Sequence, residues 1–308
     1  EELKPRLLKR DKLHSLKKDP IKVVTNKPER IELSNLSLGE IIINKRTGNI
    51  QHWRFQDQNV LSAPLTLNIW RAPTDNDIQI APEWRLDGLD RTRAHPESID
   101  LVEEDHSVNI RVKGALAADG YKPHSRYSLL YRLMPAGELE LTLNYEPINL
   151  MTRLPRLGFA TRLDQSYDHA AWFGRGPHEC YPDRKDSAFI DRYEAPIADL
   201  FHPYIKPQEN GNRSDVRWLK LVSQSLPSLC VTCSQNMNFS LHYCSLENLT
   251  QAAHWHERHW ENAPYLYLDL AQTGLGSNAC GPDTLPEYRL QPKPYMFSLK
   301  FSLAKLED

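Results

Sequence analysis

The feature of this sequence that most constrains its fold is an alternation of apolar and polar residues with a period of two. It runs through residues 108–113, 125–133, 138–145 and 295–303. Successive side chains of a β-strand point to opposite faces, so this period predicts strands with one buried face and one exposed face. Because the alternation recurs along most of the chain, the sequence predicts a fold built almost entirely from strands.

Turn-forming residues divide the sequence into many short strands. The chain contains 22 prolines and 13 glycines. Residues 135–137, Pro-Ala-Gly, lie between two alternating segments as a hairpin signal, and residues 46–49 form a second turn after the apolar run 41–43. Short helical turns are expected only within 196–201 and 246–259. Since no central linker divides the 308 residues, we expect one large antiparallel sandwich of the all-β class.

The composition argues against several classes of protein. The chain has 38 basic and 40 acidic residues and a formal net charge of −2, which gives no electrostatic case for a nucleic-acid partner. No run of about 18 apolar residues is present, so no membrane-spanning helix is expected. Residues 1–18 are charged and lack the apolar segment of a secretory signal. The five cysteines are an odd number, which favours a reducing compartment.

Two groups of potential metal ligands lack the spacing of a metal site. Cys230 and Cys233 form a single Cys-x-x-Cys in a β-branched run without a second ligand pair, and are interpreted as packed strand cysteines. His254, His256 and His259 look like a metal site, but a strand places only the first two on one face and a helix only the last two. Packing and surface hydrogen bonding are therefore favoured for these histidines.

Two polar blocks, residues 174–184 and 204–213, carry most of the candidate chemistry. Both are too polar to be core, and we expect them to meet at one site or at one buried polar junction. Paired carboxylates could serve as the acid and the nucleophile of a glycosidase. A buried ion network is the alternative, and it is favoured. The carboxylates are Glu179, Asp183 and Glu209, and the arginines that could pair with them are Arg175, Arg184 and Arg213.

Two further loops are candidate binding sites, one with carboxylate oxygens as ligands and one rich in glycine. In residues 71–77, Asp75 and Asp77 could bind a hard cation or sugar hydroxyls, although capping of the turn is favoured. Residues 274–282 are rich in glycine, but Pro282 and the residues after it prevent the helix that a phosphate-binding loop needs. A loop with small side chains, open to a ligand, is expected there.

Together these motifs resemble the C-terminal domain of the bacterial β-galactosidases of glycoside hydrolase family 2. Some bacteria make the same unit as the small subunit of a heterodimeric enzyme. The resemblance covers residues 21–308 and rests on the order and spacing of its motifs. These motifs are Arg71-Ala72-Pro73-Thr74-Asp75-Asn76-Asp77, Gly174 to Arg184 with Tyr181-Pro182-Asp183-Arg184, Glu209-Asn210-Gly211, His254-x-His256-x-x-His259, and Gly274-x-Gly276 through Leu285-Pro286-x-Tyr288.

The resemblance implies a large antiparallel super-sandwich, similar to galactose mutarotase, in a cytoplasmic enzyme. That enzyme hydrolyses terminal β-D-galactosides such as lactose with retention. The two catalytic glutamates of the family lie in an upstream TIM barrel, as do the Mg²⁺ and Na⁺ sites, so this chain is expected to carry no catalytic residue, metal or cofactor. The expected partners are that barrel, in cis or as a large subunit, and the galactoside. Residues 1–20 resemble a linker or the end of the preceding immunoglobulin-like domain, which favours a piece of a longer chain.

In this family the domain forms one wall of the active-site mouth. In some members a tryptophan of the glycine-rich loop stacks on the sugar. Here Cys280 stands near that position, so Asn278 or a neighbour is expected to hydrogen-bond to the sugar instead. The residues expected near substrate are Asp75, Asn76, Asp77, Asn278 and Cys280.

A structural polar network is expected beneath that wall. Within it, Glu179, Asp183 and Arg184 are predicted to be buried and mutually paired, with Glu209 and Arg213 as further members.

A function of a different class is the alternative. The chain could be an independent sugar-binding module or an aldose 1-epimerase-like enzyme. An epimerase needs a carboxylate base and a histidine acid that face each other. Glu209 and His178 are the best such pair in the sequence.

Overall fold

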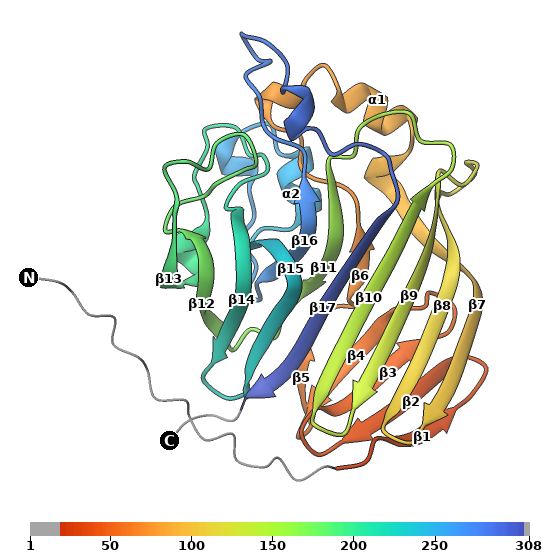
Figure 1. The fold of residues 1–308 in the computed structure, drawn as a ribbon. Helices are drawn as coiled ribbons and strands as arrows, with labels where there is room; N and C mark the ends of the chain where they lie inside the picture. Colours follow the sequence, from red (N-terminus) through yellow and green to blue (C-terminus); the bar gives the residue numbers. More distant parts are fainter. Residues whose placement is uncertain (1–18, 305–308) are drawn as a thin grey trace, which may run out of the picture.

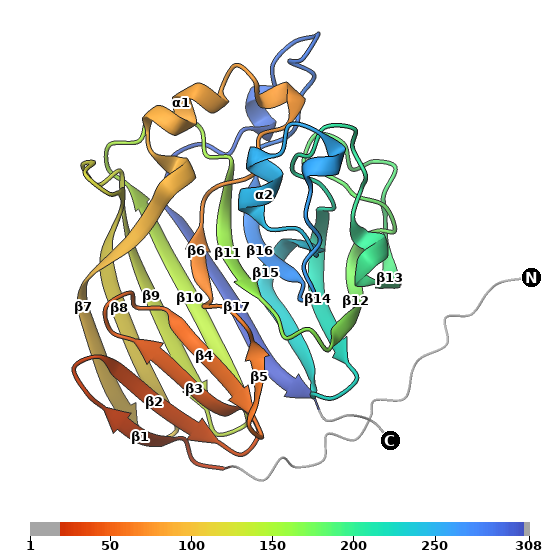
Figure 2. The ribbon, with the colours of Figure 1, turned by 180° about the vertical axis from the view of Figure 1, so that it is seen from behind.

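The computed structural model of the protein describes residues 19–304. Two antiparallel sheets account for most of these residues, one of 12 strands and one of five. Figure 1 shows the large sheet curving across the molecule, and Figure 2 shows the small sheet lying against its lower part. Apart from Asp19 and Pro20, the predicted linker or domain end at residues 1–20 lies outside the described residues. The domain boundary before residue 21 therefore stays a prediction.

The small sheet is a meander of five strands in chain order. The predicted turn at residues 46–49 joins its third and fourth strands, and residues 41–43 lie in the third. Its strands are β1 (Lys22–Asn26), β2 (Arg30–Asn35), β3 (Gly39–Asn44), β4 (Ile50–Phe55) and β5 (Gln58–Leu61).

The large sheet follows a path of nine strands with a branch. In order across the sheet, the path is β13 (Phe189–Pro196), β12 (Tyr167–Gly176), β14 (Arg213–Ser223), β15 (Ser228–His242), β17 (Tyr295–Ala304), β10 (Glu138–Pro147), β9 (Ser125–Met134), β8 (Ser107–Ala118) and β7 (Thr92–Glu104). The first part of β15 pairs with β17 and its last part pairs with β16 (Tyr265–Gln272). Strand β16 in turn pairs with β11 (Arg156–Arg162), which pairs with β6 (Thr66–Asn68).

The predicted alternation is the packing pattern of the core. Leu141 of β10 lies opposite Tyr131 of β9 and Leu299 of β17, and all three side chains are buried. One cluster of buried apolar residues takes members from both sheets, such as Ile41 and Leu141. The predicted hairpin at residues 135–137 is present. The predicted fold class, an all-β antiparallel super-sandwich, is therefore confirmed.

Helices are few and short, as expected. The predicted helical turns contain η3 (Ile197–Leu200), α2 (Leu246–Gln251) and η4 (Trp255–Glu257). The remaining helical segments are η1 (Asp75–Asp77), α1 (Ala81–Leu86), η2 (Leu89–Arg91) and η5 (Pro286–Tyr288). Helix α1 was not predicted, because six residues are too few to show a helical period. None of the helices in residues 19–304 combines the length and the apolar composition that a membrane span requires.

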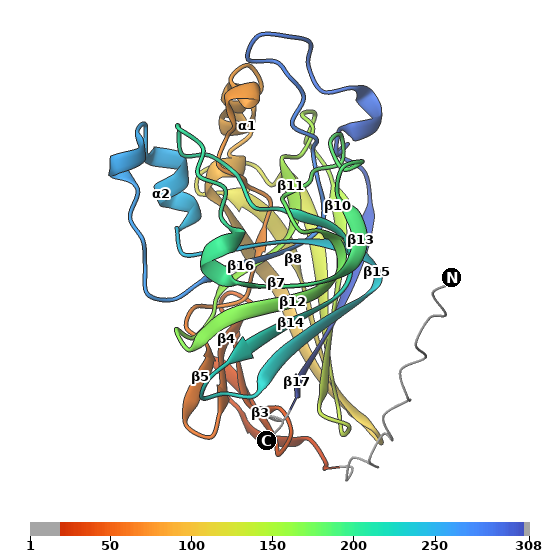
Figure 3. The same cartoon turned by 90° about the vertical axis from the view of Figure 1, so that its left-hand side faces the viewer.

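Long connections gather at one end of the large sheet. Residues 69–80, 177–188, 201–212 and 273–285 lie there, and Figure 3 shows them above the strand ends in side view. We call these four connections the loop end. Every polar block that the sequence pointed to, apart from the histidine motif, lies at the loop end or on a strand that enters it.

Candidate functional site

A buried arginine–aspartate pair closes the first connection of the loop end. The guanidinium of Arg71 donates to both carboxylate oxygens of Asp77, at 3.1 and 2.7 Å, and both side chains are buried. Asp77 also accepts the backbone N–H of Thr74 at 2.9 Å, while Arg71 donates to the carbonyl of Thr273. The turn of η1 points the carboxylate of Asp77 inward onto Arg71, and the favoured capping of this turn is observed. The proximity of Asp77 to substrate stays a prediction.

The two residues before Asp77 have different roles. Asp75 is exposed and lies 3.4 Å from the ammonium of Lys206. Asn76 joins this connection to the glycine-rich loop, because its amide donates to the carbonyl of Gly276 at 2.9 Å and accepts from the N–H of Ala279 at 3.0 Å. Asn76 thus holds the glycine-rich loop in place, and Asp75 remains on the surface.

The glycine-rich loop is anchored from below and open above. Asp183 accepts the backbone N–H groups of Leu275 and Gly276 at 2.9 and 2.6 Å. At the tip, Asn278 is partly exposed and the thiol-bearing Cys280 is exposed. The anchoring fixes the loop while its tip stays available to a ligand or to a neighbouring domain.

Glu179 links the two polar blocks that the sequence singled out. Its carboxylate accepts from Arg184, from the hydroxyl of Tyr204, and from the N–H of Gly211 at 2.7 Å. The predicted burial and mutual pairing of Glu179, Asp183 and Arg184 is only partly correct. The side chain of Arg184 is 47% exposed, and Asp183 binds the glycine-rich loop instead of Arg184. The tight turn that carries both residues points them in different directions.

The centre of the loop end is a buried triad of one arginine and two carboxylates. Arg156 donates to Glu209 at 3.1 Å, and to Asp269 at 3.1 and 2.7 Å. All three side chains are almost fully buried. Burial raises the pKa of Asp269 to about 6, against the opposing pull of the Arg156 charge. Two carboxylates thus share one guanidinium in the interior, and neither is free to act on a substrate.

The sequence analysis missed Arg156 and Asp269. Each lies in a run of apolar residues, in β11 and β16 respectively, and these two strands pair with each other. A charged residue inside an otherwise apolar strand was the signal that could have identified them, since an unpaired buried charge is very unfavourable.

The other two arginines of the polar blocks do not bind the carboxylates that were expected. Arg175 binds Asp215 at 2.5 Å. Arg213 is buried, and within residues 19–304 its hydrogen bonds go to backbone carbonyls and it forms no ion pair, so the predicted ion pairing of Arg213 is not found there. Its acceptors are the carbonyls of Leu200, Gly211 and Pro177, at 2.8, 2.7 and 3.0 Å. Arg213 therefore ties the two polar blocks together by capping carbonyls where the chain has no regular sheet partner.

The pair proposed for an epimerase is not assembled. Glu209 is buried against Arg156, whereas His178 is exposed and hydrogen-bonds to the hydroxyl of Ser187 at 3.1 Å. A general base has to reach the proton that it removes. The carboxylate of Glu209 cannot meet this condition, because its contacts are with interior groups.

The histidine motif lies apart from this network: His254 caps the start of η4, His256 lies on η4 and His259 follows it. His254 binds Glu257 at 3.1 Å and stacks on the ring of His256, with the ring centroids 5.5 Å apart. His259 donates its backbone N–H to the side chain of Asn248. Within residues 19–304, no three His, Cys, Asp or Glu side chains are arranged to hold a metal ion. The favoured interpretation, packing and surface hydrogen bonding, agrees with these contacts.

Cys230 and Cys233 both lie in strand β15, as the sequence predicted. Both are half-buried free thiols, and burial raises the pKa of each. A raised thiol pKa leaves little thiolate at neutral pH, which is typical of cysteines that only pack.

The loop end is thus a scaffold of internally satisfied charges beneath an exposed rim. Each of its buried carboxylates faces an arginine or backbone amides, so the predicted carboxylates do not form an acid–nucleophile pair. The rim carries Asp75, Asn278 and Cys280. This arrangement can present a shaped surface. Beneath it, the hydroxyl of Tyr181 is buried without a hydrogen-bond partner among residues 19–304, and burial raises its pKa.

Comparison with known proteins identifies relatives of this chain. The model of a family described as the β-galactosidase small chain matches residues 37–301. The β-galactosidase of Staphylococcus xylosus is 28% identical over 281 residues, which cover 91% of this chain and 28% of that protein. The β-galactosidase of Arthrobacter sp. (strain B7) is 32% identical over 267 residues, which cover 77% of this chain and 26% of that protein. The chain therefore spans about a quarter of the length of these relatives.

Solved structures with a similar fold include aldose epimerases. Galactose 1-epimerase from Lactobacillus acidophilus matches with a TM-score of 0.48 and 9% identity, over 92% of this chain and 97% of the epimerase. An aldose epimerase homologue from C. elegans matches with a TM-score of 0.45 and 11% identity, over 94% of this chain and all of that protein (100%). These likenesses concern the fold alone.

The match to the family model and the curated relatives covers most of the chain, from the small sheet to the last strand of the large sheet. The chain belongs to the β-galactosidase small-chain family.

Proposed function

We propose that this chain is the C-terminal domain of a retaining β-galactosidase and carries no catalytic glutamate. In this proposal the catalytic glutamates, Mg²⁺ and Na⁺ belong to a barrel-bearing remainder, in cis or as a large subunit, and the substrate is a terminal β-D-galactoside such as lactose. The proposal is supported by membership of the family and by the length of the relatives, of which the chain spans about a quarter. The free thiols of the described cysteines support a cytoplasmic location.

The observation that carries the proposal is that buried carboxylates at the loop end are paired with arginines. Glu209 and Asp269 share Arg156 in the interior, and Asp77 binds Arg71. A retaining glycosidase needs one carboxyl group as acid and a second as nucleophile, about 5–5.5 Å apart and both open to the substrate. The loop end does not offer such a pair, so its role is to shape the wall of a site whose catalytic groups come from elsewhere. The exposed rim at Asp75, Asn278 and Cys280 is our candidate for that wall.

The direct test is an assay of the purified 308-residue chain with a nitrophenyl β-galactoside. We expect no turnover above buffer. Co-expression with the barrel-bearing polypeptide of the same organism should give a complex that hydrolyses the substrate. Turnover by the isolated chain would refute the proposal.

The contribution of the rim is tested in the restored complex. We expect Asn278→Ala to raise KM more than it lowers kcat, because the side chain would contact bound sugar before and during the reaction alike. Gln58→Ala, an exposed change on β5 of the small sheet, is the matched control and should leave both constants unchanged. Equal KM and kcat values for the two variants would show that Asn278 does not contact the bound sugar.

A further inference from the structure

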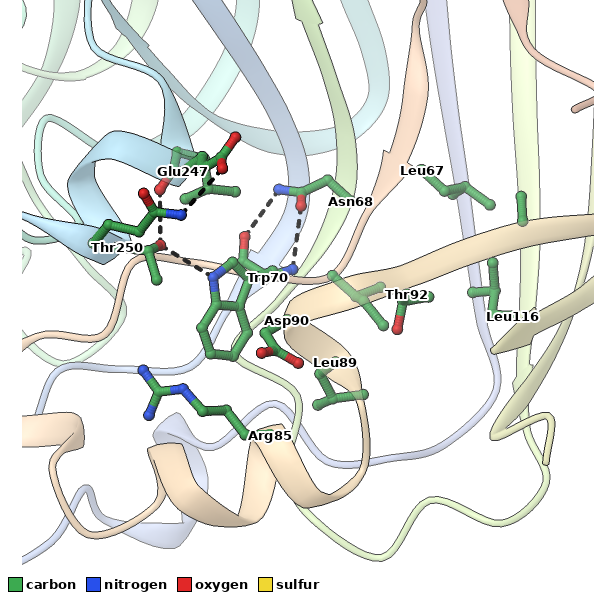
Figure 4. Close-up of a pocket in the computed structure, with 14 residues that line it drawn as sticks. Leu67, Asn68, Trp70, Arg85, Leu89, Asp90, Thr92, Leu116, Glu247 and Thr250 are labelled. Carbon is green, nitrogen blue, oxygen red and sulfur yellow. Dashed lines mark hydrogen bonds between the residues drawn. The ribbon is translucent and has the colours of Figure 1, made fainter. Parts of the chain in front are cut away.

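A cavity of about 660 Å³ lies between the two α-helices. It is lined by β6 and the residues after it, by α1 and the start of β7, and by α2. Figure 4 shows Arg85 and Asp90 on one side of Trp70, with Glu247 and Thr250 on the other. This volume falls in the range of about 300–1,000 Å³ that is typical of small-molecule sites. The cavity is thus large enough for a ligand of one or two rings.

The wall of the cavity combines an indole with leucines. Trp70 is held on both sides, because its indole N–H donates to the hydroxyl of Thr250 at 3.3 Å and the guanidinium of Arg85 lies 5.8 Å from its ring centroid. Leu67, Leu89 and Leu116 line the adjoining part. Trp70 is 6% exposed, and Leu89 and Leu116 are 1% exposed. These side chains thus offer a ligand a small apolar area, which suits a C–H face better than a hydrated ion.

The polar groups of the cavity stand on opposite walls and are largely unused. Within residues 19–304, the guanidinium of Arg85 forms no ion pair, and its described contact is the one with Trp70. The carboxylate of Glu247 likewise forms no ion pair there and accepts one hydrogen bond, from the amide of Gln251 at 3.1 Å. Asp90 lies near Arg85 but pairs with Arg91 at 2.6 Å. The α1 side of the cavity therefore presents the guanidinium of Arg85 beside Asp90, and α2 presents the carboxylate of Glu247 beside the amide of Gln251.

This arrangement discriminates between classes of ligand. A phosphate or another anion would meet two carboxylates against one guanidinium, and a purely apolar ligand would bury Arg85 and Glu247 without partners. A neutral polyhydroxylated ring satisfies both walls, since each hydroxyl both donates and accepts. Its C–H face can lie on the indole and the leucines.

We propose that the cavity between α1 and α2 is a binding site for a neutral sugar of one or two hexose rings. Arg85 donates to ring or hydroxyl oxygens, Glu247 and Gln251 accept from and donate to hydroxyls, and Trp70 contacts the apolar face. The site goes beyond the proposed function, because apart from Ile69 and Trp70 its lining lies outside the loop end, and it requires no hydrolysis.

The test is calorimetric titration of the 308-residue chain with lactose, and in separate arms with D-galactose and D-glucose. We expect saturable binding of at least one of these sugars. Arg85→Ala and Glu247→Ala should each weaken that binding about tenfold, as expected for the loss of one hydrogen bond to a charged group. Both side chains are exposed enough for the variants to fold, and thermal unfolding of each variant checks this.

Matched controls come from strand β13, which lies at the far edge of the large sheet and exposes the basic Arg192 beside the acidic Asp191 and Glu194. Arg192→Ala and Glu194→Ala should leave sugar affinity unchanged. The proposal is overturned if none of the three sugars gives saturable heat, or if the folded Arg85 and Glu247 variants bind as tightly as these controls. The readout is binding alone, so a failed activity assay for the proposed function leaves this result interpretable.

Discussion

The two halves of the large sheet are stabilised in different ways. In the half formed by β8, β9, β10 and β17, apolar side chains form continuous rows, such as Leu141 between Tyr131 and Leu299. In the half formed by β11 and β14 to β16, buried charges lie on β11, on β16 and in the connection before β14, with Arg156 between Glu209 and Asp269. Both halves are equally buried at these positions. The same sheet thus contains a core held by apolar packing, which has no preferred direction, and a core held by ion pairs, which need a fixed geometry.

The difference matters because the two kinds of contact tolerate change differently. Apolar rows depend on volume and pattern, so other apolar residues of similar size can replace their members. A buried ion group depends on each partner, because removal of one leaves the other charged and desolvated. The charged half also supports the loop end, so its side chains can fix loop positions that an apolar core would leave free.

The sharpest test of this comparison is Arg156→Ala. We expect a loss of about 3–5 kcal/mol in the free energy of unfolding, because Glu209 and Asp269 would remain buried without their cation. Urea denaturation measures it. The matched control is Arg162→Ala on the same strand, where the arginine is 29% exposed and pairs with Glu261, and a loss below about 1 kcal/mol is expected. Similar losses for the two variants would mean that burial of the ion group is not what stabilises this half.

In the apolar half, Leu141→Ala should cost about 3 kcal/mol through lost burial and a residual cavity. The neighbouring residue Thr142 faces the other side of the sheet, where its hydroxyl contacts that of Ser298 at 3.0 Å. Thr142→Ala should cost less than about 1 kcal/mol. Denaturation of the pair therefore tests the period of two directly. A larger loss of stability for the residue 142 variant would show that the buried face of β10 had been assigned to the wrong residues.

A smaller effect is expected at the edge of the charged half. Asp77→Asn removes the ionic part of the bidentate pair with Arg71 and should cost about 2 kcal/mol. Asp75, two residues earlier, is exposed beside Lys206. Asp75→Asn should cost less than about 1 kcal/mol. If thermal or urea unfolding ranks the two substitutions the other way round, the inward orientation of Asp77 is incorrect.

The smallest effect is a dependence on pH, and each half contributes one buried histidine. Burial, aided by the charge of Arg156, lowers the pKa of His242 to about 4. Burial likewise lowers the pKa of His124 to about 4. Since the pKa of a histidine in the unfolded chain is about 6.5, the unfolded chain binds more protons than the folded chain between about pH 4 and pH 6.5. Stability is therefore present above pH 6.5 and is lost as pH falls towards 4, by at most about 1.4 kcal/mol per pH unit for each histidine.

His242→Phe should remove the contribution of the charged half and leave that of His124. The substitution places a ring among Phe201 and Tyr267, which already flank His242. The raised pKa of Asp269 acts with the opposite sign over part of this range, and its contribution is lost as pH rises through about 6. The measurement is consequently the difference between wild type and variant in urea denaturation at pH 5 and pH 7. No difference in slope would show that His242 is not held neutral by its surroundings.

Prediction from the sequence succeeded where the signal was local. The hairpin through residues 135–137, the rows of β10 and β17 and the helical turns near 196–201 and 246–259 follow from neighbouring residues. It failed where the partner lies far along the chain. Arg156 and Asp269 are 113 positions apart in the chain, and neither carries a local mark of their pairing. The inward orientation of Asp77, in contrast, rests on partners three and six residues away, and the favoured capping of this turn agrees with it.

The sequence by itself determined the all-β class and the family of this protein, because period two and motif order are written along the chain. Only the tertiary structure decided which carboxylates are paired with arginines in the interior and which side chains remain exposed on the rim. It also brought α1 and α2 together around the cavity at Trp70. The physical reason is that alternation needs only adjacent residues, whereas charge pairing and cavities depend on segments that meet only after the sheet has folded.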